Sequence, residues 1–182
     1  MTLSGLILLR AAPLLASTSS ITMTICEEVY FRPFGTPQAS LRPQANRLLR
    51  AHVNSFGPYS MALTASLYSL SIGTAIANLA FRDGSLSLSS SDVLGISTSG
   101  THGTAAALYL ASVVFNAMHF AFGPRDLALI NVVMDETKVD ADKGKDNCTA
   151  MGDWVSLNVV RALVADLPGW ICSFAGFMMA FS

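Results

Sequence analysis

The stretch from Val53 to Phe81 constrains this chain most, because its 29 residues include no Asp, Glu, Lys or Arg. A helix needs roughly 20 predominantly apolar residues to cross the hydrocarbon core of a bilayer. Charged residues make up only 13% of the chain, against about a quarter in soluble domains. The stretch predicts a membrane-spanning helix over residues 57–81 and argues against a soluble globular domain.

Three further apolar stretches raise the expected number of spans to four. Residues 103–123 contain no Asp, Glu, Lys or Arg, and the Gly123-Pro124 pair that follows favours the end of a helix. Residues 4–30 and 154–181 are also long enough to span. We therefore expect an all-α protein, an integral membrane four-helix bundle that forms one transmembrane domain over residues 1–182.

The first apolar stretch has two interpretations. Small residues after an apolar region are typical of a cleaved signal peptide. Arg10 lies inside this region rather than before it, which is the reverse of the usual order. The hydroxyl-rich run from Ser17 to Ser20 suits close helix packing in lipid, so we favour a retained span.

Basic residues between the spans predict the topology. Residues 32–56 and 125–153 hold eight Lys or Arg together, whereas residues 82–102 hold one. The positive-inside rule places the two basic connections in the cytosol, in a multi-pass protein for which the endoplasmic reticulum is the default membrane. The sequon at Asn147 would then not be glycosylated, because it would face the cytosol. The acid-rich stretch 135–146 would be a solvated loop.

The fourth expected span carries three polar residues that point to a site. Ionisable groups inside a membrane are costly and need a partner or a wet cavity. By the 3.6-residue period, Asn158, Arg161 and Asp166 share one broad side of the helix. Arg161 could bind an oxyanion and Asp166 could accept a proton, or the two could form an internal ion pair that only stabilises the bundle.

The third expected span carries a second set. Asn116 and His119 are three residues apart and share a face, so a neutral His119 could serve as a base in a bundle interior. The alternative is a purely structural histidine. Asn78 on the second span suggests a wetter interior, and we expect an apolar pocket. Its expected lining residues are Tyr68, Phe115 and Phe120.

Two features lie near the first connection. One of the two acids Glu27 and Glu28 faces the bundle at its cytosolic mouth, with Glu27 as the substrate-binding candidate; the alternative is an interfacial acid paired with Arg32. Residues 38–52 mix leucines with arginines, which predicts a short helix on the membrane surface.

Other classes of function find little support. The near-zero net charge of −1 argues against a nucleic-acid partner. The three cysteines form no CxxC pair, which argues against a structural zinc site. No P-loop, GxGxxG, HExxH or GxSxG motif is present, so we expect no metal and no cofactor.

The last helix also resembles a known group. The sequence AMGDWVSLNVVRALVADLPGWICSFAGF is similar to the last helix of small fungal membrane proteins related to the anthrone oxygenases. The shared positions are Trp154, Asn158, Val160, Arg161, Asp166, Leu167 and Trp170. The opening LLRAAPLLASTSSITMTICEEVYF and the later PQANRLL resemble the first helix and connection of the same group. Its members often carry a histidine where this chain has Asn158, which argues against proton transfer there.

This resemblance implies four spans and the cofactor-free oxygenation of a polyketide-derived anthrone in secondary metabolism. Such a reaction needs a base, for which His119 and Asp166 are candidates, and an oxyanion partner, for which Arg161 is the candidate. The expected substrate-binding residues are Asn116, Asn78, Tyr68 and Glu27. A membrane cyclase of a polyketide pathway and a non-enzymatic scaffold for pathway enzymes remain the alternatives.

Overall fold

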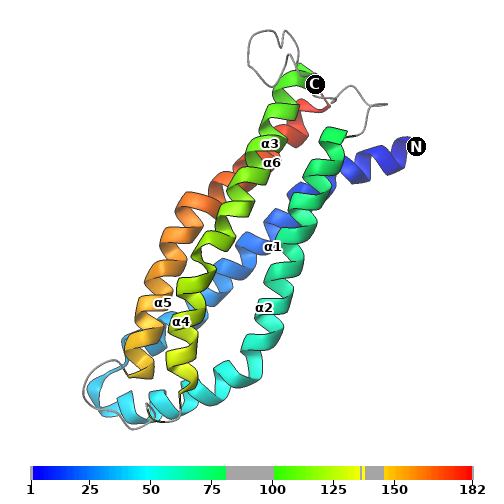
Figure 1. The fold of residues 1–182 in the computed structure, drawn as a ribbon. Helices are drawn as coiled ribbons and strands as arrows, with labels where there is room; N and C mark the ends of the chain where they lie inside the picture. Colours follow the sequence, from blue (N-terminus) through cyan, green and yellow to red (C-terminus); the bar gives the residue numbers. More distant parts are fainter. Residues whose placement is uncertain (1, 81–100, 136, 138–145, 182) are drawn as a thin grey trace. The chain divides into compact units, whose positions relative to one another are not determined.

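The computed structural model describes residues 2–80, 101–135, 137 and 146–181. These residues form helices and no strand, which confirms the predicted all-α class. The six α-helices in Figure 1 are α1 (Leu3–Gly35), α2 (Arg42–Ala80), α3 (Thr101–His119), α4 (Gly123–Met134), α5 (Asn147–Arg161) and α6 (Leu167–Met179). Short 3-10 turns at Ala39–Leu41 and Phe120–Phe122 precede α2 and α4, and a π-helical turn, Ala162–Asp166, joins α5 to α6.

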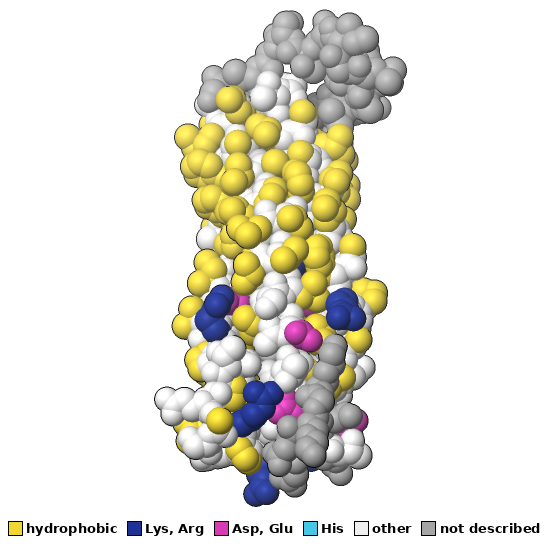
Figure 2. Space-filling view, turned by 90° about the vertical axis from the view of Figure 1, so that its left-hand side faces the viewer, with side chains coloured by type: hydrophobic (Ala, Val, Ile, Leu, Met, Phe, Trp, Pro, Cys, Tyr) yellow, Lys and Arg dark blue, Asp and Glu magenta, His cyan; other side chains and the backbone are white. Residues whose placement is uncertain are grey.

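Four continuous helical stretches are long and apolar enough to cross a membrane, by length and composition. They are Leu3–Gly35, Ala39–Ala80, Gly103–Met134 and Asn147–Met179. Many large apolar side chains on them are exposed, among them Leu3 at 74% and Val29 at 70%. Figure 2 shows hydrophobic side chains over much of the visible surface. Exposed apolar surface on this scale is a sign of lipid or protein contact.

Three helix boundaries differ from the sequence-based expectation. The Gly123-Pro124 pair does not end the third helical stretch, because Pro124 lies in the first turn of α4, where a missing N–H costs nothing. The helix expected over residues 38–52 is part of α2 from Arg42 onward, and Leu49 in it is fully buried. The last stretch begins at Asn147 rather than near residue 154.

The chain divides into two compact units, and helices α1 and α2 contribute residues to both. Unit 1 comprises Met1–Ile21, Ala65–His119 and Leu163–Ser182. Unit 2 comprises Thr22–Thr64 and Phe120–Ala162.

Unit 1 is almost free of charge. Among its described residues, Arg10 and Asp166 are the only acidic or basic side chains apart from histidine. Arg10 is buried, donates from Nη1 to the carbonyl oxygen of Ala180 at 2.7 Å, and lies 5.4 Å from the ring centroid of Phe181. Each charged group in this unit therefore needs a local partner, as expected for a low-dielectric interior.

Helices α3 and α6 pack side by side within unit 1 (Figure 1). Gly176 of α6 lies in this contact, where a Cβ atom would meet the Cβ of Leu108 at 3.4 Å, an ordinary van der Waals distance. Small residues at such positions let membrane helices approach closely. The same contact brings polar side chains of the two helices together.

Unit 2 has the larger apolar core. Its buried members are Phe31, Leu49, Val53, Leu129, Val133, Ala150, Met151, Trp154 and Val155. The end of α1 approaches α5 at two glycines, since a Cβ atom on Gly35 would lie 2.7 Å from the Cα of Gly152. No side chain fits at that distance unless the backbone moves.

This contact gives a stability prediction. Gly35→Ala should lower the free energy of unfolding by about 1–3 kcal/mol, because overpacking against backbone forces the helices apart. Gly73→Ala is the matched control, since a Cβ atom there meets nothing within 4 Å, and it should be neutral or stabilising. Thermal unfolding of the two purified variants measures both effects, and equal unfolding temperatures would contradict the prediction.

Candidate active site

Unit 1 contains a buried histidine–aspartate pair. His119, the last residue of α3, places Nδ1 2.9 Å from Oδ1 of Asp166. The two side chains are 8% and 1% exposed. The structure thus joins two predicted catalytic residues that are 47 positions apart in the sequence.

The position of Asp166 follows from a proline. Pro168 has no N–H for the carbonyl of Val164, and its ring displaces that carbonyl, so regular α-helix cannot continue. The helix widens into the π-helical turn Ala162–Asp166 instead. Such turns occur often at functional sites, and here the turn ends on the carboxylate that meets His119.

Tyr68 of α2 covers the histidine ring. The two ring centroids lie 3.7 Å apart, with an angle of 28° between the planes. Tyr68 is 1% exposed. Its aromatic face fixes the imidazole plane from one side while Asp166 holds one ring nitrogen.

A second polar layer lies one helical turn away. Asn116 donates from Nδ2 to the hydroxyl of Ser71 at 3.2 Å, and Ser71 donates to the carbonyl oxygen of Pro13 at 3.3 Å. Gly169 lies against this amide, since a Cβ atom there would lie 2.9 Å from Asn116 Oδ1. Ser71, Asn116 and Gly169 are three residues from Tyr68, His119 and Asp166 respectively. Each lies on the same helix face as that residue.

The hydrogen bond between His119 and Asp166 defines the chemistry that the pair can perform. An ionised carboxylate can only accept a hydrogen bond, so with Asp166 ionised the donor of this bond is Nδ1 of His119. A histidine oriented in this way by a carboxylate is a general base. The pair is suited to removing a proton from an apolar substrate.

Asn78, the other amide expected at the site, has a structural contact. It donates from Nδ2 to the carbonyl oxygen of Leu9 at 2.8 Å. That carbonyl lacks its helical partner because Pro13, four residues on, has no N–H. The contact accounts for a buried amide here, and a role in substrate binding stays a prediction.

Arg161 and Asn158 belong to unit 2 and contact each other there. Arg161 is 5% exposed; it donates from Nη1 to Asp126 Oδ2 at 2.9 Å and from Nη2 to the Asn158 amide oxygen. Sequence reasoning missed Asp126, which stands three residues after Gly123 in a segment predicted to be a connection. The ion pair expected between Arg161 and Asp166 and the oxyanion role of Arg161 both stay predictions.

Glu27 and Glu28 have different partners. Ser60 donates to Glu27 Oε1 at 2.6 Å, whereas Arg32 pairs with Glu28. Glu27 therefore faces α2 rather than Arg32. Phe120 is 45% exposed, and its expected place in the lining of a pocket stays a prediction. Phe115 is half-buried.

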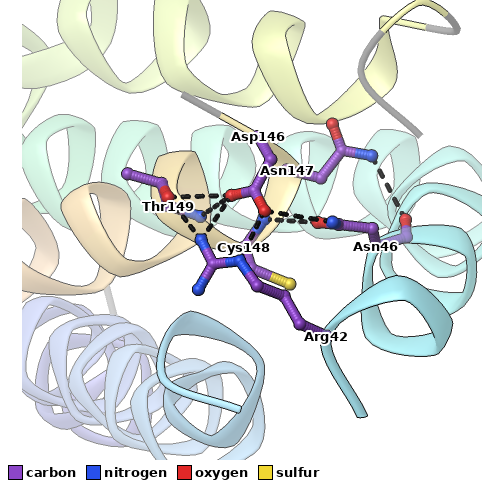
Figure 3. Close-up of polar contacts among 6 residues, drawn as sticks. All are labelled: Arg42, Asn46, Asp146, Asn147, Cys148 and Thr149. Atoms are coloured by element: carbon purple, nitrogen blue, oxygen red, sulfur yellow. Dashed lines mark hydrogen bonds and ion pairs between the residues drawn. The ribbon is translucent and has the colours of Figure 1, made fainter. Parts of the chain in front are cut away.

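Another polar cluster in unit 2, shown in Figure 3, was missed by sequence reasoning. Asp146 accepts from Arg42 Nε at 2.6 Å and Nη2 at 2.7 Å, and from Asn46 Nδ2 at 3.1 Å. It also caps α5, because Thr149 N donates to it at 2.8 Å. An aspartate three residues before a threonine is an N-cap signal that the sequence contains.

This cluster corrects the expectation of a solvated loop up to residue 146. Burial alone raises the pKa of Asp146, but the hydrogen bonds from Arg42, Thr149 and Asn46 outweigh it and hold the pKa well below its ordinary value. Asn147 is 0% exposed and donates from Nδ2 to the Asn46 carbonyl oxygen. The sequon asparagine is thus inaccessible in the folded chain. The rest of 135–146, apart from Asp135 and residue 137, lies outside the described residues.

The described residues contain no group of three or more His, Cys, Asp or Glu side chains that could hold a metal ion. Their fold and site define a class: an all-α protein with four long apolar helical stretches and a buried pair of a histidine and an aspartate.

Comparisons with known proteins show the family. The chain is 30% identical over 173 residues to a protein of Penicillium citrinum described as epoxidase gkaX, which covers 93% of this chain and 92% of the relative. It is 34% identical over 73 residues to a probable epoxidase, scpX, of Mollisia scopiformis, which covers 40% and 42%. No protein-family model matches, and no solved structure matches. The chain belongs to the fungal family that includes the epoxidase gkaX. A relation to the anthrone oxygenases stays a prediction.

Proposed function

We propose that this protein is a membrane-bound oxygenase of fungal secondary metabolism that acts on a hydrophobic, polyketide-derived intermediate and forms an epoxide or a related oxygenated product. The observation that carries this proposal is the buried His119–Asp166 pair, covered by Tyr68, in a chain whose relatives are described as epoxidases. The four apolar helical stretches support residence in a bilayer, for which we propose the endoplasmic reticulum. Enzymes that supply the substrate are the expected protein partners.

The proposed reaction starts with proton removal. Nε2 of His119 takes an acidic C–H proton from the substrate, while Asp166 stabilises the imidazolium that forms. The resulting carbanion is electron-rich and reduces molecular oxygen. A new C–O bond gives a peroxide anion, which recovers the proton from His119 as a hydroperoxide.

The hydroperoxide has two balanced outcomes. Its outer oxygen can add to a neighbouring C=C bond, so that the O–O bond breaks and the product holds an epoxide and a hydroxyl group. If the attacked carbon was a CH₂ group, the hydroperoxide can instead lose water and leave a carbonyl, as an anthrone-type oxygenation would. Oxygen is the oxidant and the substrate supplies all the electrons in both cases.

Oxygen-18 labelling tests this proposal. Membranes that contain the full chain would be incubated under ¹⁸O₂ with the apolar extract of a strain that lacks the gene. We expect a gene-dependent product with two labelled atoms from the epoxide route, or one from the carbonyl route. A gene-dependent product without label would overturn the oxygenase proposal in favour of a cyclase. The absence of any gene-dependent conversion would favour a scaffold.

A further inference from the structure

Asn116 carries a buried amide oxygen that the proton-transfer step does not use. The residue is 0% exposed, and its Oδ1 has no hydrogen-bond partner among the residues that the structure describes. A buried acceptor without a partner costs free energy and is rare in folded proteins. An unpaired acceptor one turn from a catalytic pair is a candidate contact for a ligand.

The hydrogen bonds of α1 and α2 fix which atom of the amide is unpaired. Ser71 commits its hydroxyl hydrogen to the carbonyl oxygen of Pro13, which can only accept. The oxygen of Ser71 is then available only as an acceptor, so Asn116 must turn its Nδ2 toward it. Oδ1 is left on the other side, and this position can bind only a hydrogen-bond donor.

The contact with α6 places this acceptor beside the catalytic pair. Oδ1 faces Gly169, where even a Cβ atom would lie at 2.9 Å. Asn116 precedes His119 by three residues, and Gly169 follows Asp166 by three. Residues with this spacing lie roughly 5–6 Å apart on one helix face. Asn116 and His119 therefore lie one turn apart on one face of α3, where both contact residues 166–169.

We propose that the amide oxygen of Asn116 accepts a hydrogen bond from a hydroxyl or N–H group of the substrate and selects for substrates that carry one. The inference rests on the proposed function and narrows its substrate class. The substrate is a hydrophobic molecule that carries a hydroxyl or N–H donor beside its acidic hydrogen. Analogues in which this donor is methylated bind more weakly.

Two small aromatic probes test the proposal without turnover. The probes are 1-naphthol, which has a donor, and 1-methoxynaphthalene, which lacks it. Calorimetric titration of the full-length protein in nanodiscs, with oxygen excluded and empty nanodiscs subtracted, gives both dissociation constants. Wild type should bind 1-naphthol roughly three- to tenfold more tightly, the effect of one neutral hydrogen bond.

Variants assign this preference to Asn116. Asn116→Leu keeps the size of the side chain but removes the acceptor, so the ratio of the two dissociation constants should fall to about one. Gly169→Ala should lower the ratio too, because its methyl group meets Oδ1. Ser112→Ala is the control, since this buried hydroxyl donates to the Tyr109 carbonyl oxygen of its own helix, and the ratio should stay at the wild-type value.

Equal binding of the two probes to wild type, or an unchanged preference in Asn116→Leu, would overturn the inference. The result is separable from the proposed function, because the titration involves no reaction. Retained ¹⁸O incorporation with no probe preference would reject the Asn116 inference alone. A clear preference with an unlabelled product would reject the oxygenase proposal alone.

Discussion

Membranes that carry His119→Ala should form the oxygenated product at least 100-fold more slowly than wild-type membranes. A positioned general base contributes roughly 10²- to 10⁴-fold to a rate, and alanine removes the nitrogen that takes the proton. Asp166→Asn should slow the reaction at least tenfold, because an amide can hold the imidazole in the wrong tautomer and cannot stabilise its charge. Product formed per unit of membrane-resident protein, measured by mass spectrometry, checks both values.

His52→Ala is the control for this experiment. His52 belongs to unit 2, where its ring stacks on Tyr30 and Phe56 at centroid distances of 5.0 and 5.7 Å. Removing it deletes a histidine without touching the His119–Asp166 pair, so activity should stay within a fewfold of wild type. A His119→Ala enzyme as active as the His52→Ala enzyme would show that His119 is a structural residue.

Asp146→Ala should lower the free energy of unfolding by about 2 kcal/mol. The variant loses the N-cap of α5, typically ~1 kcal/mol, and leaves Arg42 and Asn46 without their acceptor. Arg42 is 37% exposed, so water compensates part of this loss. Asp153→Asn, an exposed acid on the same helix, should change stability by no more than about 0.5 kcal/mol, and thermal unfolding of both variants gives the comparison.

The same aspartate predicts a dependence on pH. The pKa of Asp146 is lower in the folded chain than in the unfolded chain, where it is about 4. Its contribution is therefore complete above pH ~4 and is lost progressively as the pH falls further and the carboxylate becomes protonated. Asp146→Ala should lose less stability than wild type between pH 5 and pH 3. Parallel losses for the two proteins would contradict this account of the cluster.

The helical class and the residues of the His–Asp pair were predictable from the sequence for a clear physical reason. In a bilayer the backbone N–H and C=O groups of an apolar stretch of more than 20 residues must bond to each other, and a helix satisfies them within the stretch. His119 and Asp166 stand out because ionisable groups are rare in such stretches. Their pairing was not predictable, because it depends on how α3 packs on α6 and on the π-helical turn before Pro168.

The polar contacts of unit 2 were harder to foresee. Arg42 and Asp146 are separated by 104 positions, and the sequence predicts a surface helix for the first and a solvated loop for the second. A sequence does not show whether a charged side chain is exposed to water or paired with a residue that is distant along the chain. Asp146 could have been found as a helix N-cap, since the local signal was present, but its bidentate pairing with Arg42 could not.

Hydrogen–deuterium exchange in the substrate tests the central claim most directly, that His119 and Asp166 form a proton-transfer site. The extract from a strain lacking the gene would be incubated with membranes in D₂O without oxygen, so that carbanion formation reverses and leaves deuterium in the precursor. We expect wild-type membranes to catalyse this exchange and His119→Ala membranes to match membranes without the protein. Equal exchange with wild type and His119→Ala would contradict the account, because the proton would then be removed by another group.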